Sequence, residues 1–143
     1  MSDTTTATAA PRTLALPSPT SLRAAAQSAA RRGGPLVVMT TLTGCPYCDL
    51  VRQHHLLPLS RAGQVVAVQL DVRDRRSRLQ GFAGESTSPA EQIVQWGAKF
   101  APTVLFMGPQ GQELAERLVG VAVPDFYGEY LEARLQQARN KLK

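Results

Sequence analysis

Three runs of apolar residues divide the chain and predict the strands of a sheet. Residues 36–40 and 65–71 are rich in valine and leucine, as expected for strands that are buried on both faces. A third run covers residues 103–107. A Gly-Pro-Gln-Gly turn at residues 108–111 joins this run, as a hairpin, to a fourth strand predicted over residues 113–119.

Segments with helical spacing of apolar residues alternate with these runs. They predict four helices: residues 21–32, residues 45–57, a helix that begins after Ser88, and a helix over residues 124–142. Ser88 can cap its helix, Pro89 suits the first helical position, and Glu91 completes a capping box. Ile93 and Val94 are expected to continue the packed face of this helix.

Proline and glycine mark the predicted ends of the other segments. Pro58 is expected to stop the second helix, because proline removes a backbone donor and its ring clashes with the preceding turn. Residues 72–87 form a long polar connection, which we expect to hold irregular structure or a short helix. Residues 1–19 contain little that could form a core, so we expect a disordered leader there, followed by one domain over residues 20–143.

The predicted order of elements is α-β-α-β-α-β-β-α. A strand, a helix and a second strand imply a right-handed parallel crossover, and the hairpin adds two antiparallel strands. The fold class is therefore α/β, with a four-stranded mixed sheet flanked by helices on both faces.

Composition and charge exclude several classes of protein. The 143 residues are 43% apolar and 19% charged, which is typical of one globular domain. No run approaches the roughly 20 apolar residues of a membrane span. The net charge is +5, and part of it lies in residues 73–78, but this run contains Asp74 and no aromatic residue. We interpret it as a solvated loop and expect no nucleic-acid partner.

Residues 1–19 have neither a basic region nor an apolar core of the kind that a secretory signal contains. The sequence as given therefore fits a cytoplasmic protein, and a periplasmic one if a signal has been removed. We expect a monomer.

Chemistry is concentrated at Cys45 and Cys48, the two cysteines of the chain, which follow the first predicted strand and open a predicted helix. A Cys-x-x-Cys at such a junction is typical of a thiol–disulfide redox site. A cysteine at a helix start lies near unpaired N–H groups, which favour the thiolate. Cys45 is thus the candidate nucleophile and Cys48 the buried resolving thiol. Pro46 and Tyr47 between them are expected to tune the redox potential.

Other interpretations of the cysteine pair remain open. Half of a zinc site would need ligands such as His54 and His55, which lie in the middle of the following helix. A purely structural disulfide would close a loop too short to constrain the unfolded chain much. A pair of inert reduced cysteines is the third alternative.

Two separated signatures make the chain resemble the thioredoxin fold over residues 21–142. One is Cys45-Pro46-Tyr47-Cys48, and the other is Ala101-Pro102-Thr103 before the third strand. The resemblance implies a cis proline at Pro102 that lies against the cysteine pair, and a backbone at Ala101 and Thr103 that pairs with substrate. It implies protein disulfides or dithiols as substrates, an upstream redox partner, and neither a metal nor an organic cofactor.

The chain departs from thioredoxins proper at three places. It has Gly44 where they carry tryptophan, Pro46-Tyr47 where they carry Gly-Pro, and Met39 where they carry a buried aspartate. Pro-Tyr is the glutaredoxin dipeptide, but the glutathione-binding segment of glutaredoxins has no counterpart after Thr103. We therefore expect a protein thiol–disulfide oxidoreductase. The alternatives are a glutaredoxin-like, glutathione-dependent reductase and a non-catalytic binding protein on the same fold.

Overall fold

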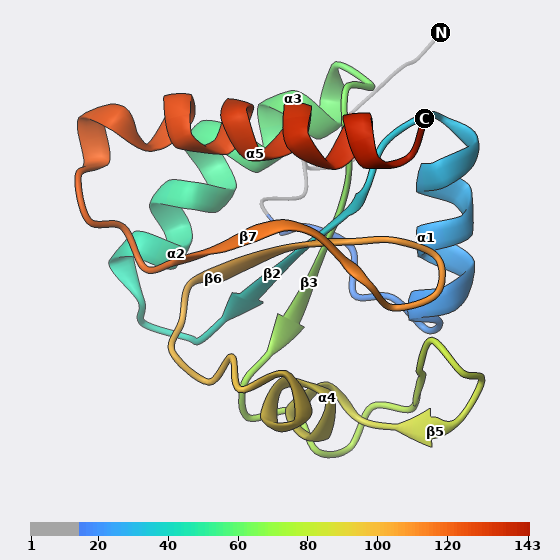
Figure 1. The fold of residues 1–143 in the computed structure, drawn as a ribbon. Helices are drawn as coiled ribbons and strands as arrows, with labels where there is room; N and C mark the ends of the chain where they lie inside the picture. The colour runs from blue at the N-terminus through green and yellow to red at the C-terminus, as the bar shows by residue number, and fades with distance from the viewer. Residues whose placement is uncertain (1–14) are drawn as a thin grey trace, which may run out of the picture.

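A computed structural model describes residues 15–143 of the chain. Most of the predicted leader, residues 1–14, lies outside the described residues. The elements follow in the order helix, strand, helix, strand, small hairpin, helix, two strands and helix (Figure 1).

The main strands are those predicted from the apolar runs, with bounds that differ by at most one residue. They are β2 (Leu36–Thr41), β3 (Val66–Asp71), β6 (Thr103–Met107) and β7 (Glu113–Val119). The helical elements, in chain order, are α1 (Leu22–Arg31), α2 (Pro46–Val51), the π-helix η1 (Arg52–Leu56), α3 (Leu57–Arg61), α4 (Pro89–Trp96), the 3-10 helix η2 (Pro124–Phe126) and α5 (Tyr127–Lys141). No helix among the described residues has the length and apolarity that crossing a membrane requires.

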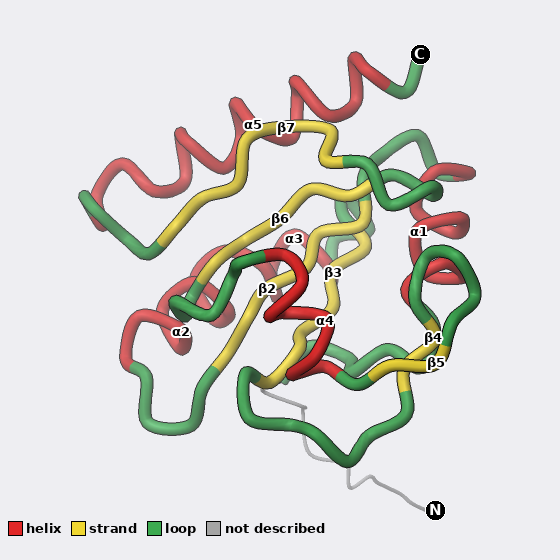
Figure 2. Tube along the Cα trace, turned by 60° about the horizontal axis from the view of Figure 1, so that its bottom comes forward, coloured by secondary structure: helices red, strands yellow, loops and turns green. Residues whose placement is uncertain are grey.

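The four main strands form one mixed sheet in the order β3-β2-β6-β7 (Figure 2). β2 pairs with β3 in parallel, and Leu36 lies opposite Val66. β6 runs antiparallel to both β2 and β7. This confirms the predicted parallel crossover followed by a hairpin.

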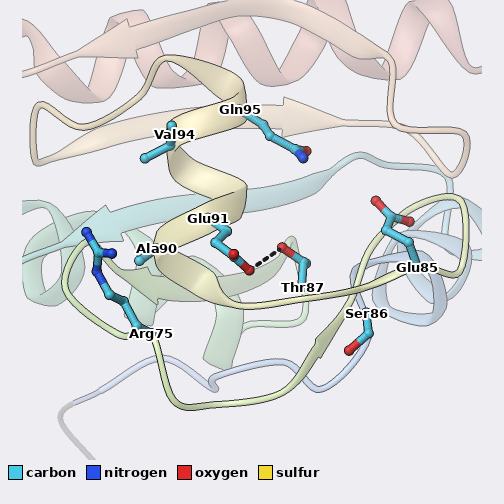
Figure 3. A pocket seen from close by; sticks show the side chains of 8 residues that line it. All are labelled: Arg75, Glu85, Ser86, Thr87, Ala90, Glu91, Val94 and Gln95. Carbon is cyan, nitrogen blue, oxygen red and sulfur yellow. Dashed lines mark hydrogen bonds between the residues drawn. The ribbon is translucent and has the colours of Figure 1, made fainter.

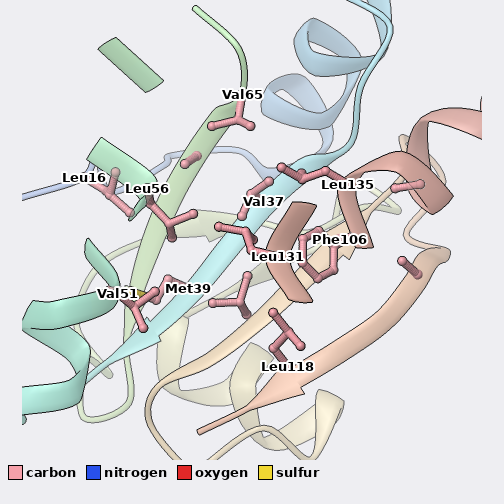
Figure 4. Close-up of a cluster of buried hydrophobic side chains, with 14 of the residues drawn as sticks. Leu16, Val37, Met39, Val51, Leu56, Val65, Phe106, Leu118, Leu131 and Leu135 are labelled. Atoms are coloured by element: carbon pink, nitrogen blue, oxygen red, sulfur yellow. The ribbon is translucent and has the colours of Figure 1, made fainter. Parts of the chain in front are cut away.

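Helices cover both faces of this sheet, because successive side chains of a strand point to opposite faces. Val37 and Met39 of β2 face α2, α3 and α5, and belong to a core cluster that includes Phe106 (Figure 4). Leu36 and Val38 face the other side and pack with residues of α1 and α4. All six residues of β2 are buried, so this central strand carries the loop that holds the cysteines.

The predicted stop at Pro58 is wrong, since the helix continues to Arg61. Shortly before the proline, the five residues from Arg52 to Leu56 form a wider π-turn. In this turn the Leu57 N–H donates to the Arg52 carbonyl. A proline ring clashes with the carbonyl four residues earlier in a regular α-helix. The wider turn lies at that carbonyl, so it makes room for the ring.

The connection over residues 72–87 differs from the predicted irregular structure or short helix. It contains a small antiparallel hairpin of β4 (Leu79–Gln80) and β5 (Ser86–Thr87). Leu79 is 1% exposed and anchors this hairpin to the α1 side of the core. One buried leucine thus organises a polar segment, which local composition did not reveal.

Burial corrects two further predictions. Leu16, within the predicted leader, is 3% exposed and lies in the same core cluster as Val37, and the Pro17 carbonyl accepts the Gln69 N–H, so this part of the leader is attached to the domain. Val94 is 57% exposed and does not continue the packed face of α4. Its neighbour Ile93 is fully buried, and consecutive residues of a helix point about 100° apart.

Candidate active site

The cysteine pair lies where β2 ends and α2 begins. Cys45 is the N-cap of α2 and Cys48 lies in its first turn, with a Cα–Cα distance of 5.2 Å. The two sulfurs are bonded as a disulfide. Gly44 immediately before them has φ +81°, a left-handed conformation that glycine adopts readily, and it turns the chain from the loop into the helix.

The two sulfurs have different surroundings. Cys45 is partly exposed, whereas Cys48 is fully buried. The Cys48 N–H donates to Cys45 Sγ at 3.2 Å, so the sulfur at the start of the helix accepts one of the N–H groups that the helix leaves unpaired. A negative charge on Cys45 Sγ would be stabilised by this donor and by the helix dipole.

A second segment, distant in sequence, meets the pair. Cys45 Sγ lies 3.8 Å from the Ala101 carbonyl oxygen, across 56 positions of sequence. The Ala101–Pro102 peptide bond is cis. The structure thus brings together Cys45 and Ala101, the two predicted parts of the site.

Buried polar contacts hold this second segment in place. The Thr103 N–H donates to the Thr40 hydroxyl of β2 at 2.8 Å, and both residues are almost completely buried. The pairing of β2 with β6 ends at Met39 and Val104. The Thr40 hydroxyl therefore satisfies the next donor, at the point where the strand passes into the Ala101–Pro102 loop.

Exposed aromatic side chains lie on both segments of the site. Tyr47, between the cysteines, is 48% exposed, and Phe100, next to Ala101, is 66% exposed. Pro46 is also exposed, at the first position of α2. The surface around Cys45 therefore offers apolar area to an approaching molecule.

A buried cation beside the pair was missed from the sequence. Arg52 is only 8% exposed, and its guanidinium donates to Asp49 Oδ1 at 2.8 Å, to Gln69 Oε1 at 3.0 Å and to Thr41 Oγ1 at 2.5 Å. The sequence places this arginine in a predicted helix but does not show whether its side chain faces solvent or the sheet. Only the fold reveals the acceptors from β2 and β3.

The two histidines lie away from the cysteines. His54 is exposed, and His55 is partly buried, with its ring centroid 5.2 Å from that of Tyr127 on α5. Within residues 15–143, no group of three or more His, Cys, Asp or Glu side chains is arranged to hold a metal ion.

An open hollow of about 590 Å³ lies between α4 and the β4–β5 hairpin (Figure 3). Arg75, Thr87, Glu91 and Val94 are among its lining residues, and Thr87 donates to Glu91 at 3.5 Å. Neither cysteine lines it. This hollow is therefore separate from the cysteine pair, and the exposed surface at Cys45 remains the candidate site.

Comparison with known proteins assigns the family. A family model described as a thioredoxin-like domain matches residues 22–135, which include the cysteine pair and the Ala101–Pro102 loop. The chain belongs to the thioredoxin-like domain family. None of the curated proteins matches it.

Solved structures share the fold of this thioredoxin-like domain at low sequence identity. Thioredoxin O2 from Arabidopsis thaliana, in the oxidised state, has a TM-score of 0.54 and 17% identity, and the match covers 82% of this chain and 91% of that one. Poplar thioredoxin h has a TM-score of 0.51 and 17% identity, over 75% and 82% of the two chains.

A third structure comes from work on the thiol-resolving mechanism in yeast mitochondrial 1-Cys peroxiredoxin via glutathione/thioredoxin systems. It has a TM-score of 0.53 and 19% identity, and the match covers 85% of this chain and 93% of that one. Family membership together with the disulfide-bonded Cys45–Cys48 pair makes this thioredoxin-like domain a thiol–disulfide oxidoreductase.

Proposed function

We propose that the protein exchanges disulfides with other proteins through Cys45, by way of a mixed disulfide. In the reducing direction, the Cys45 thiolate attacks a substrate disulfide and releases one substrate thiolate. The Cys48 thiolate then attacks the mixed disulfide and releases the second substrate thiolate. The pair gives up two electrons and becomes the Cys45–Cys48 disulfide, which an upstream dithiol partner reduces again.

The contrast between the two sulfurs is the observation that carries this proposal. Cys45 is the partly exposed one, and its sulfur accepts the Cys48 N–H at the start of α2. Cys48 is fully buried, so an external substrate cannot reach it first. A stabilised, accessible thiolate is the attacking group that exchange requires, and a buried partner one turn away resolves the intermediate.

The Ala101–Pro102 loop supplies the place for the substrate chain in this proposal. The Ala101 carbonyl lies 3.8 Å from Cys45 Sγ, so a peptide bound along the backbone at Ala101 would bring its own cysteine to that sulfur. The buried Thr103 N–H already donates to Thr40 and is not free to pair with that peptide. Tyr47, between the cysteines, and Phe100, next to Ala101, provide exposed apolar side chains for that peptide. Pro46 and Tyr47 tune the potential through the surroundings of the two sulfurs.

Insulin reduction by dithiothreitol tests the proposal. The unmodified protein is expected to accelerate precipitation of the insulin B chain, and Cys45→Ser to reduce the rate to that of dithiothreitol alone. Pre-reduced Cys48→Ser, incubated with insulin after dithiothreitol has been removed, should instead accumulate a mixed disulfide, visible as a mass increase that added dithiothreitol reverses. Equal rates for the unmodified protein and Cys45→Ser would exclude Cys45 as the nucleophile.

The Pro46-Tyr47 dipeptide, which resembles that of glutaredoxins, supports a second candidate function. In it, glutathione takes the place of the protein dithiol as the reductant. Reduction of hydroxyethyl disulfide by glutathione separates the two functions, because a protein-specific enzyme is expected to leave this small substrate unreacted. Activity there that depends on Cys45 would favour the glutathione-dependent function.

A further inference from the structure

Arg52 lies on the same face of its helix as the buried cysteine. The Arg52 N–H donates to the Cys48 carbonyl, the regular α-helical bond between residues four apart, and the π-turn begins only after it. Residues at this spacing are surface neighbours, with Cβ atoms about 5–6 Å apart. Both side chains are buried, so both point from the helix toward the sheet.

The guanidinium of Arg52 is fixed in this position rather than free to reach water. Gln69 Oε1 of β3 and Thr41 Oγ1 at the end of β2 accept from it on the sheet side. Asp49 accepts at its outer edge, and the Asp49 side chain is 64% exposed. Two of the three acceptors are neutral and the third, the Asp49 carboxylate, is largely exposed to water, so the positive charge of the guanidinium is only partly offset.

We propose that Arg52 sets the redox equilibrium of the Cys45–Cys48 pair by stabilising the thiolate form of the reduced protein. This inference rests on the proposed disulfide exchange. In it Arg52 is a positioning residue, because its charge acts on the sulfurs and it does not touch the substrate. Reduction breaks the sulfur–sulfur bond with two electrons and creates thiolate charge at the start of α2. Arg52 follows Cys48 by one helical turn and Cys45 by about two, and a fixed cation there favours thiolate charge on the pair and so favours the reduced state.

The other titratable groups near Arg52 either oppose its effect on the thiolate or contribute less to it. On the helix these are Asp49, which opposes the effect of Arg52, and the two histidines of η1, of which His54 is exposed. On the sheet side, Asp71 ends β3 opposite Thr41, but its carboxylate accepts the Arg73 N–H at 2.8 Å. Met39, beneath the helix on the same face of the sheet, is fully buried and uncharged.

The test compares the redox equilibria of three variants in glutathione buffers, with the fraction of free thiol measured by alkylation and mass shift. Arg52→Met removes the charge and keeps most of the side-chain volume. We expect its oxidation by glutathione to become about tenfold more favourable, a shift of about 30 mV for this two-electron couple. Arg52→Lys keeps a positive charge and should stay within about threefold of the unmodified protein.

Asp49→Asn provides the matched control, because it removes the opposing charge at an exposed position that is expected to tolerate the change. It should shift the equilibrium toward the reduced form, opposite in sign to Arg52→Met. A purely structural role for the ion pair predicts shifts of the same sign for both variants, or none, and either result overturns the inference. So does a shift in Arg52→Lys as large as that in Arg52→Met.

The insulin assay keeps this inference separate from the proposed function. If the unmodified protein reduces insulin through Cys45 and the equilibria of the variants do not move in opposite directions, only the role of Arg52 fails. If the unmodified protein does not exchange disulfides, the proposed function itself fails. Should Arg52→Met not fold, Arg52→Gln takes its place, because it also removes the charge but keeps a hydrogen-bond donor, and it should shift the equilibrium in the same direction as expected for Arg52→Met.

Discussion

Removal of the Thr40 hydroxyl tests the contact that joins the central strand to the start of β6. Thr40→Val replaces a hydroxyl by a methyl group of nearly the same shape, so it opens no cavity. It leaves the Thr103 N–H without the acceptor that now lies 2.8 Å away in a buried environment. A buried donor that loses its partner costs about 1–3 kcal/mol, so we expect the free energy of unfolding to fall by about 2 kcal/mol.

Urea denaturation measures this loss directly. With a urea dependence of about 1–3 kcal/mol per molar, the midpoint should fall by about 1 M at unchanged slope. The control is Thr43→Val in the exposed loop before Cys45, where the hydroxyl contributes little and the change should stay within about 0.5 kcal/mol. Equal midpoints for Thr40→Val and the unmodified protein, or an equal loss in Thr43→Val, would refute the role of this hydrogen bond.

Three further changes test other features of the structure. Gly120→Ala should destabilise the protein by about 1–3 kcal/mol, since φ is +67° and the new Cβ would lie 2.9 Å from the Phe100 ring. The control is Gly97→Ala, which has a similar φ of +65° but no neighbour near the new Cβ and should destabilise the protein less. Urea midpoints of the two variants measure the difference. Tyr127→Phe should raise the thermal midpoint, by a stability gain of about 1 kcal/mol, because the buried hydroxyl has no hydrogen-bond partner among the described residues. Burial lowers the pKa of His55 below its ordinary value of 6.5, so protonation favours the unfolded chain. Stability should therefore fall as the pH drops through about 6.5, and urea midpoints from pH 7 to pH 5 should fall less in His55→Gln.

The sheet could be predicted because its strands are buried in a way that local sequence records. Every residue of β2 and of β6 is buried, and a strand covered on both faces must be apolar along its whole length. Such runs stand out against the polar segments between them. Once the runs are found, the handedness of the crossover and the hairpin turn leave few arrangements of the four strands.

The errors lie where distant contacts outweigh local preference. Pro58 is a strong stop signal, but the π-turn ahead of it accommodates the ring and the helix continues. Leu79 and Leu16 are isolated apolar residues in polar surroundings, and nothing nearby shows that the core has room for them. Val94 is the opposite case, because an apolar residue type does not decide which side of a helix it occupies.

The residues of the candidate site also differ in whether local sequence could predict their positions. Cys45 and Cys48 are three positions apart, so their spacing alone brings the sulfurs together once the helix forms. Ala101 comes to the same place from 56 positions away, and only the resemblance to a known fold predicted it.

Nothing in the sequence indicates that Arg52 is buried, because an arginine in a helix is usually solvated. Its burial is tolerable only if acceptors compensate the lost hydration, and two of them come from strands 11 and 17 positions away. In this fold, the cysteine pair proposed to carry the exchange can therefore be read from local spacing. A residue that adjusts its equilibrium can be found only after the strands have been placed beneath the helix.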